Sequence, residues 1–289
     1  MMVRTCAGSI GELVEGPMWC KKRNSLFFTD ILNGTVFEYI PKTEKIQHWK
    51  LGTYVGCIIP GRDRDEMIAA VDDCLKVFHP EDGRAETLCR FPMADGIRFN
   101  DGKCGPGGQL WIGTMAVSGQ KDRPEGGLYR IGPDGRTCCV EPSLAIPNGM
   151  AWDLEKGIFY HVRTEEQAVY SYSCHQDWNT IRNPKKSVDL SGEKGVPDGM
   201  AIDRDGNLWI AMWGGYKVIC VNPASGMKLM EVALPDADVS SCTFGGGHLD
   251  ELYITTAREG QAGGNVYVAD AGVAGTYPYE FCWKEEEEK

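Results

Sequence analysis

The stretch Pro197–Ala211 (PDGMAIDRDGNLWIA) decides the fold, because two other parts of the chain repeat its order of residue types. Pro147–Tyr160 (PNGMAWDLEKGIFY) and Glu15–Phe28 (EGPMWCKKRNSLFF) each place an oxygen-bearing side chain directly before a glycine. An apolar residue follows three positions after that glycine, and then come a polar turn and an apolar run typical of a strand. Recurrence of this kind indicates a repeat architecture.

Six such units follow one another along the 289 residues. Their starts are about 40 to 50 residues apart, the length of one four-stranded blade. We place the starts near Glu15, Tyr54, Asn100, Ile146, Val196 and Val239. Asn33-Gly34 between two apolar runs predicts a hairpin. The sequence therefore predicts an all-β, six-bladed β-propeller with a central tunnel, as a single domain over residues 1–284, followed by a disordered acidic tail over residues 285–289.

Glu15, Asn148 and Asp198 occupy the same position in three of these repeats. In a propeller the first strand of each blade lines the axial channel, so the three side chains are expected to converge there. Asn-Gly and Asp-Gly pairs also make turns, which is the alternative interpretation of any single copy. Three copies at one position, one of which carries a glutamate, favour a cation site at the axis.

The composition excludes several classes of partner. The formal net charge is −11 and the sequence shows no basic stripe, which argues against binding to nucleic acid or to an anionic membrane. The chain has no apolar stretch approaching the ~18 residues of a membrane helix, and we expect no signal peptide. Its 12 cysteines include no C-x-x-C pair. We therefore expect reduced thiols and a cytoplasmic protein.

Carboxylate and amide oxygens without cysteine or histidine are the donors that a hard divalent cation prefers. Ca²⁺ is the first choice, and Mg²⁺, Mn²⁺ or a three-oxygen Zn²⁺ site are alternatives. The sequence has no G-x-S-x-G elbow and no P-loop, so metal-assisted chemistry remains. A cation polarises a carbonyl and lowers the pKa of water. Asp198 or Asp101 could then move protons. Arg98 could orient a substrate or stabilise a developing oxyanion, although arginine is usually a surface residue.

The same residues resemble the SMP-30/gluconolactonase/luciferin-regenerating-enzyme family, which includes regucalcin. The resemblance extends to about Tyr277, and its most specific part is R-x-N-D-G-K followed by G-T-M. The matching motifs are Glu15-Gly16-Pro17-x-Trp19, Arg98-x-Asn100-Asp101-Gly102-Lys103, Gly113-Thr114-Met115, Asn148-Gly149, Pro197-Asp198-Gly199 and Cys242-Thr243-Phe244-Gly245-Gly246.

This resemblance implies one divalent cation in the tunnel, held by Glu15, Asn148 and Asp198. It also implies that Arg98 and Asp101 contact the substrate, that Asn100 lies near or on the metal and is grouped with the substrate contacts, and that Asp198 acts as general base or acid. The implied reaction is the opening of a sugar-type lactone such as gluconolactone. We expect a small-molecule lactone or ester as substrate, and a monomer or weak dimer.

Three departures from the family pattern leave the substrate open. Val117-Ser118 stands where many members have an acidic substrate contact, and Arg163 stands where an aspartate is usual. Glu12 is a rival to Glu15 as metal ligand, although Gly16-Pro17 favours Glu15. The alternative functions are a non-catalytic calcium-binding or regulatory protein, a hydrolase of an organophosphate or luciferin-related ester, and a protein-interaction propeller. The last lacks the G-H…W-D repeat signature.

Overall fold

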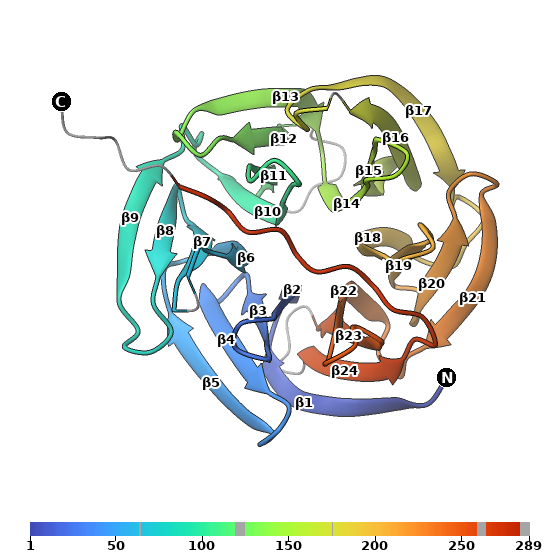
Figure 1. The fold of residues 1–289 in the computed structure, drawn as a ribbon, viewed down its shortest axis with the longest axis horizontal. Coiled ribbons are helices and arrows are strands. Elements are labelled where there is room, and N and C mark those ends of the chain that lie inside the picture. The colour runs from blue at the N-terminus through green and yellow to red at the C-terminus, as the bar shows by residue number, and fades with distance from the viewer. Residues whose placement is uncertain (64, 119–124, 175, 259–263, 284–289) are drawn as a thin grey trace.

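The computed structural model describes residues 1–63, 65–118, 125–174, 176–258 and 264–283. The strands form six four-stranded antiparallel sheets, set radially around an axis (Figure 1). The predicted six-bladed β-propeller is confirmed. The expected acidic tail, residues 285–289, lies outside the described residues.

The first three blades follow the chain in order, each from the axis outward. Blade 1 contains β2 (Val14–Cys20), β3 (Ser25–Asp30), β4 (Thr35–Ile40) and β5 (Lys45–Lys50). Blade 2 contains β6 (Val55–Pro60), β7 (Met67–Val71), β8 (Cys74–Phe78) and β9 (Ala85–Arg90). Blade 3 contains β10 (Ile97–Cys104), β11 (Leu110–Ala116), β12 (Gly126–Ile131) and β13 (Thr137–Leu144).

The last three blades complete the ring, and the sixth combines strands from both ends of the chain. Blade 4 contains β14 (Pro147–Asp153), β15 (Ile158–Arg163), β16 (Ala168–Cys174) and β17 (Ile181–Asp189). Blade 5 contains β18 (Val196–Ile202), β19 (Leu208–Trp213), β20 (Lys217–Asn222) and β21 (Met227–Ala233). Blade 6 contains β22 (Asp238–Gly245), β23 (Glu251–Ala257) and β24 (Gly264–Asp270), and its outermost strand is β1 (Val3–Gly11). This pairing of β1 with β24 closes the ring.

The innermost strands are buried along most of their length, and each contains an irregularity. All seven residues of β14 are buried. In β2, β10, β14 and β18 the pairing with the second strand skips two residues, while β6 and β22 skip one. A bulge of this kind leaves residues unpaired and redirects side chains. The skipped residues of β14 and β18 are Asn148-Gly149 and Asp198-Gly199. These pairs therefore lie inside strands and do not form turns.

The two glycines in these bulges permit close approach between blades. A Cβ atom on Gly199 would lie 2.0 Å from the hydroxyl of Ser241 in the next blade. A Cβ atom on Gly149 would lie 2.7 Å from the carbonyl oxygen of Asp198. Any side chain at these positions would force neighbouring first strands apart. The glycine after each oxygen donor thus keeps the donors of adjacent blades close together.

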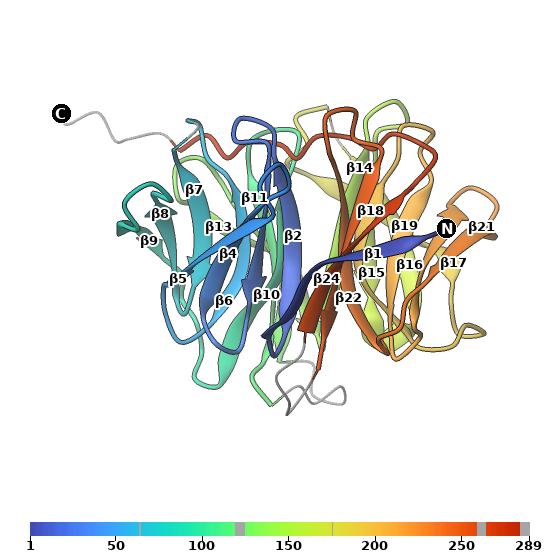
Figure 2. The same cartoon turned by 90° about the horizontal axis from the view of Figure 1, so that it is seen from below.

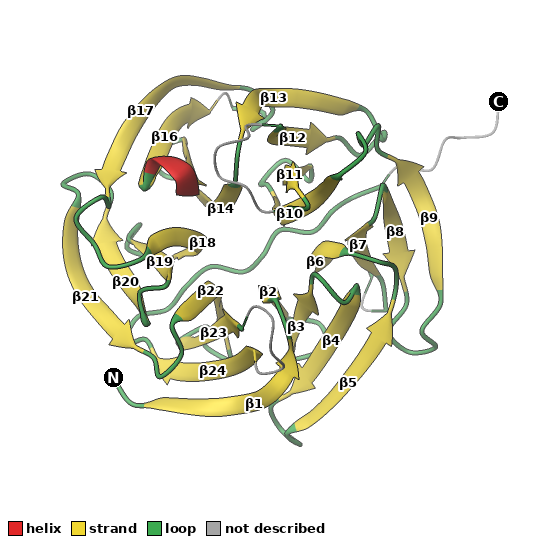
Figure 3. Ribbon diagram, turned by 180° about the vertical axis from the view of Figure 1, so that it is seen from behind, coloured by secondary structure: helices red, strands yellow, loops and turns green. Residues whose placement is uncertain are grey.

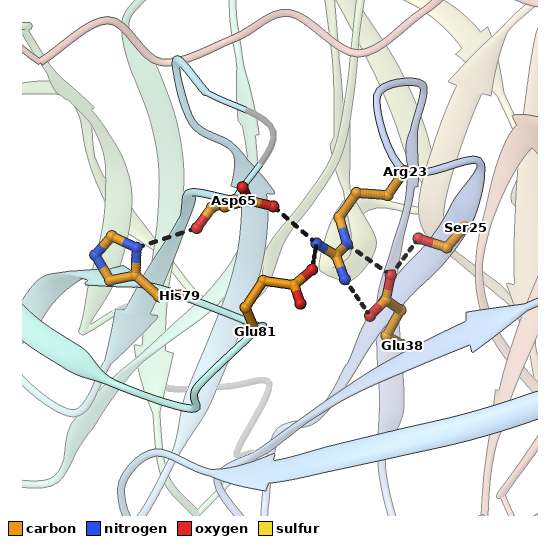
Figure 4. Close-up of polar contacts among 6 residues, drawn as sticks. All are labelled: Arg23, Ser25, Glu38, Asp65, His79 and Glu81. Atoms are coloured by element: carbon orange, nitrogen blue, oxygen red, sulfur yellow. Dashed lines mark hydrogen bonds and ion pairs between the residues drawn. The ribbon is translucent and has the colours of Figure 1, made fainter.

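An ion-pair cluster joins blade 1 to blade 2 (Figure 4). Arg23 Nε lies 2.8 Å from Glu38 Oε1, and Glu38 also accepts a 2.6 Å hydrogen bond from Ser25. The same guanidinium reaches Asp65 at 3.2 Å and Glu81 at 2.7 Å, both on blade 2. The side chain of Glu38 is only 1% exposed, so its charge depends on Arg23 for compensation.

After β24 the chain crosses the hub on one face of the ring; we call residues 271–283 the strap (Figures 1 and 2). It is anchored by hydrogen bonds from Arg204 N to Ala274 O (2.9 Å) and from Phe281 N to Pro60 O (3.0 Å).

Within the described residues, the only helical element is the one-turn 3-10 helix η1 (Thr164–Glu166), drawn red in Figure 3. The described part of the chain contains no helix long and apolar enough to cross a membrane.

Candidate metal and substrate site

The oxygen donors predicted from the repeats all lie on first strands, next to the axis. Glu15 is on β2, Asn148 on β14 and Asp198 on β18, and these side chains are buried. Arg98, Asn100 and Asp101 lie on β10 and are also buried. Long-range electrostatic interactions join Glu15, Arg98, Asp101 and Asp198 into one group. The ring arrangement therefore brings residues more than 180 positions apart in sequence into a single polar cluster.

A chain of hydrogen bonds links three blades at this cluster. Asn100 Nδ2 donates to Pro147 O at 3.1 Å and to Asn148 Oδ1 at 3.3 Å. Asn148 Nδ2 donates to Thr164 Oγ1 at 3.1 Å, and Thr164 Oγ1 donates to Pro197 O at 2.8 Å. Pro197 directly precedes Asp198. These hydrogen bonds together fix the side-chain amide of Asn148 relative to the backbone that precedes Asp198.

Arg98 is held by its neighbours on β10. Its Nη1 donates to Asn100 Oδ1 at 2.8 Å and to Phe99 O at 2.9 Å. Its Nε is buried and has no hydrogen-bond partner within the structure. Burial lowers the pKa of Arg98 to about 10, although the charges of Glu15 and Asp198 oppose this. The guanidinium remains charged at neutral pH, and its buried Nε donor is unsatisfied.

The two carboxyl groups of the predicted metal site repel each other. Burial and then the charge of Asp101 raise the pKa of Glu15 to about 8. Burial and the charges of Glu15 and Asp101 raise the pKa of Asp198 well above its ordinary value. Burial without a sufficient positive counter-charge favours the neutral form of an acid. A divalent cation between Glu15 and Asp198 would supply positive charge and favour the ionised form of both acids.

Asp101 is the third acid of the cluster. Burial raises its pKa, and the charge of Lys103 offsets part of this rise. Neither of its carboxylate oxygens has a hydrogen-bond partner among the described residues. Lys103 donates its ammonium to Met200 O. Asp101 and Lys103 are among the residues that line a cavity of about 80 Å³ on the strap side of the hub.

The donor set fits a hard divalent cation. Two buried carboxylates and one buried amide oxygen supply oxygen ligands and two negative charges, as such a cation requires. Among the described residues, no group of three or more His, Cys, Asp and Glu side chains is placed to hold a metal ion. Of the three predicted ligands only Glu15 and Asp198 are acids, and Asn148 would supply the third protein oxygen.

The alternatives raised by the sequence lie away from this cluster. Glu12 precedes β2 and lines an outer groove with His48 of β5, whereas Glu15 faces the other tunnel residues. Arg163, at the end of β15, pairs with Glu141 at 2.7 Å and Glu166 at 2.9 Å. Its charge is thereby neutralised at the junction of blades 3 and 4. Val117 is half-buried and Ser118 is exposed, with no acid at either position.

Sequence reasoning missed Thr164. It lies in η1, directly after Arg163, and touches Asn148 as well as the strand that carries Asp198. The only indication in the sequence is that Thr164 directly follows Arg163, the residue that departs from the family pattern in the fourth blade. A hydroxyl side chain carries no periodic signature, so only the three-dimensional contacts identify its role.

Comparison with known proteins identifies the family to which the chain belongs. The "SMP-30/Gluconolactonase/LRE-like region" model matches residues 13–258. The chain is 32% identical over 246 residues to the Bacillus subtilis protein named "Putative sugar lactone lactonase YvrE", covering 85% of this chain and 83% of that protein. It is 31% identical over 282 residues to Homo sapiens regucalcin, covering 93% of this chain and 94% of that protein.

A solved structure of a luciferin-regenerating enzyme superposes with a TM-score of 0.89 at 29% identity, covering 96% of this chain and 98% of that chain. The match to the family model spans most of the chain, including all three predicted metal ligands and both ends of the hydrogen-bond chain. The protein therefore belongs to the SMP-30/gluconolactonase/LRE-like family.

Proposed function

We propose that this protein is a divalent-metal-dependent lactonase that hydrolyses a sugar-type lactone. The observation that carries the proposal is the placement of Arg98 and Asn100 directly beside the donors Asn148, Glu15 and Asp198. A protein that only binds calcium needs no buried guanidinium next to its ligands. The relationship to a sugar lactone lactonase by name supports the same reaction class.

Glu15, Asn148 and Asp198 would hold the cation, with Ca²⁺ as first choice and Zn²⁺, Mn²⁺ or Mg²⁺ as alternatives. When bound, the cation would polarise the lactone carbonyl and make water more acidic. Asp198 would accept the proton of the attacking water and return it to the ring oxygen that leaves. This assignment gives Asp198 two roles, ligand and general base.

Arg98 would face the carbonyl oxygen as it gains negative charge, because its guanidinium stays charged and has an unused Nε donor. Asn100 would fix the guanidinium and contact the substrate next to it. Asp101 would accept a hydrogen bond from a substrate hydroxyl that projects past the cation into the tunnel. The unpaired state of all 12 cysteines supports a reducing compartment, and we propose the cytoplasm.

The test combines metal analysis with a lactone panel. Purified protein is stripped with EDTA, reloaded with one cation at a time, and assayed on gluconolactone and related sugar lactones. We expect no turnover without metal, recovery on reloading, and loss of at least about a thousandfold in kcat for Asp198→Ala. Asp205→Asn, an exposed acid in the turn after β18, serves as control.

Full activity of Asp198→Ala would overturn the proposal. Tight cation binding with no hydrolysis of any lactone would favour the calcium-binding regulatory function instead. Hydrolysis of organophosphate or luciferin-related esters, with none of sugar lactones, would keep the metal mechanism and replace the substrate class.

A further inference from the structure

The side chain of Arg163 lies at the centre of a polar network between blades 3 and 4. Its Nη2 lies 2.7 Å from Glu141 Oε1 on β13 and donates to the hydroxyl of Tyr172 at 2.9 Å. Tyr172 in turn donates to the other carboxylate oxygen of Glu141 at 2.7 Å. Nη1 of Arg163 lies 2.9 Å from Glu166 Oε1. One guanidinium therefore joins the outermost strand of blade 3 to η1.

Glu166 belongs to η1, the single helical turn that also carries Thr164 (Figure 3). The second carboxylate oxygen of Glu166 accepts a hydrogen bond from the hydroxyl of Tyr170. The guanidinium carbon of Arg163 lies 4.1 Å from the centroid of the Tyr170 ring. Arg163, Glu166 and Tyr170 thus contact one another around the turn and hold its outer side.

The backbone around η1 is fixed as well. Glu165 accepts a 3.3 Å hydrogen bond from the backbone N–H of Ala145, in the segment between blades 3 and 4. The N–H of Gln167 donates to Thr164 O at 3.1 Å, and Gln167 O accepts from Leu190 N at 2.8 Å. The position of η1 is therefore set by neighbours on both sides of blade 4.

On its inner side η1 presents Thr164 to the candidate metal site. The threonine hydroxyl accepts from Asn148 Nδ2 at 3.1 Å and donates to Pro197 O at 2.8 Å. Arg163 is the strand partner of Pro147, the residue before Asn148. The network therefore extends from β13, at the rim, to a predicted cation ligand through one helical turn.

The charge of Arg163 is balanced where it lies. Although burial favours the neutral acid, the pKa values of Glu141 and Glu166 lie below the ordinary value, because neighbouring donors and the Arg163 charge favour the ionised form. Two carboxylates thus surround one guanidinium. The positive charge is used within this network, so an effect of Arg163 on the hub is one of geometry.

We propose that Arg163 is a positioning residue for the cation site and acts through η1 and Thr164. By pairing with Glu141 and Glu166 at once, it fixes the turn so that the Thr164 hydroxyl receives the amide of Asn148. An aspartate, the usual residue of the family at this position, could not pair with two glutamates. The inference rests on the cation site of the proposed function and does not require that the substrate be a lactone.

The test is a calorimetric Ca²⁺ titration of the full-length protein after EDTA treatment and dialysis. Arg163→Met keeps an unbranched side chain and removes the guanidinium. We expect Ca²⁺ affinity to fall about tenfold, the lower end of the range for residues that orient a ligand. Removing a positive charge would by itself strengthen the binding of a cation. A fall in affinity therefore separates positioning from electrostatics.

The double variant Arg163→Met, Thr164→Val tests the route. If Arg163 acts through Thr164, the double variant should bind Ca²⁺ as weakly as Thr164→Val alone, to within about twofold. Two losses that multiply would show that Arg163 affects the cation site independently of Thr164, and would overturn the inference.

Arg163→Lys is the second variant, in case Arg163→Met fails to fold. It keeps the charge beside Glu141, but one ammonium cannot bridge two carboxylates as the planar guanidinium does. We expect a loss of about two- to fivefold in Ca²⁺ affinity, the value of one partly exposed ion pair.

Arg23→Met is the matched control. The side chain of Arg23 is 10% exposed and that of Arg163 is 15% exposed, and each guanidinium bridges acids of two adjacent blades. Arg23 has no contact with η1 among its hydrogen bonds and ion pairs. Folded Arg23→Met should bind Ca²⁺ like the parent protein.

Unchanged or tighter Ca²⁺ binding in both Arg163 variants would overturn the inference and leave the proposed function standing. An equal loss in Arg23→Met would also overturn it, because the loss would then reflect general destabilisation. A parent protein that binds no divalent cation would overturn both proposals. The expected affinities in a protein that hydrolyses no lactone would contradict the proposed lactonase and support the positioning role.

Discussion

Asn148 and Thr164 are joined by a 3.1 Å hydrogen bond in which the side-chain amide of Asn148 donates to the threonine hydroxyl. Because Nδ2 is committed to Thr164, the carbonyl Oδ1 of Asn148 must point the other way, where Asn100 lies 3.3 Å from it. An asparagine can ligate a cation only through this oxygen. Thr164 therefore fixes the orientation of the Asn148 amide.

Thr164→Val should weaken cation binding about 10- to 100-fold, because residues that orient a ligand typically contribute this much. The substitution keeps the shape of the side chain and removes both hydrogen bonds of the hydroxyl. Thr164→Ser, which retains the hydroxyl, should bind the cation like the parent protein. Calorimetric titration with Ca²⁺ measures both. Equal affinity of the valine variant and its parent would contradict the positioning role.

The metal-free protein should lose stability as pH rises. Folded Glu15 has a pKa of about 8, whereas the ordinary value is 4.5. Between these values the folded state binds more protons than the unfolded state, so the free energy of unfolding decreases as pH increases. Urea unfolding in EDTA from pH 5 to pH 8 measures the slope. Glu15→Gln removes the titrating group and should flatten it.

Whereas the stability of the metal-free protein should fall as pH rises, its affinity for a cation should increase. Binding must displace the proton of Glu15, so the apparent affinity should rise about tenfold per pH unit up to about pH 8 for each proton released. Calcium titrations at several pH values test this. An affinity independent of pH in this range would mean that Glu15 is not a ligand.

Arg98→Lys should lower kcat/KM for the lactone about 100- to 1000-fold, the usual cost of removing a preorganised oxyanion donor. A lysine retains the charge but cannot donate to Asn100, to Phe99 O and to a ligand through a rigid fork. Calcium affinity should change little, since Arg98 is not a ligand. A variant with unchanged kcat/KM would exclude Arg98 from the reaction.

Arg23→Met should destabilise the fold by about 3 to 5 kcal/mol, because it leaves Glu38 buried without its counter-charge. The double variant Arg23→Met, Glu38→Met should recover much of this loss, since it removes both charges. Chemical denaturation of the three proteins gives the free energies of unfolding. A single variant as stable as its parent would show that Glu38 is compensated elsewhere.

The sequence predicted the inner part of the ring well. Repeats marked by Pro147–Tyr160 and Pro197–Ala211 reveal the first and second strands, because the buried residues there are apolar and the glycines are forced by close approach. The expected starts near Tyr54, Ile146 and Val239 fall within one residue of β6, β14 and β22. The hairpin at Asn33-Gly34 is confirmed between β3 and β4.

The outer strands were harder to predict. β9 and β17 are polar and largely exposed, so neither burial nor alternation distinguishes them from loops. β1 escaped notice for another reason: its partner β24 lies at the other end of the chain, and local patterns carry no information about such a pairing. The contacts of Thr164 likewise depend on the packing of one blade against the next.

The joining of β1 to β24 also bears on how the molecule is made. During synthesis Val3–Gly11 emerges long before its partner Gly264–Asp270. Until β24 has been synthesised, the edge of β1 is unpaired and can pair with an exposed strand edge of a neighbouring chain. Premature termination anywhere before Gly264 would leave that edge permanently unmatched, and such fragments should be prone to aggregate.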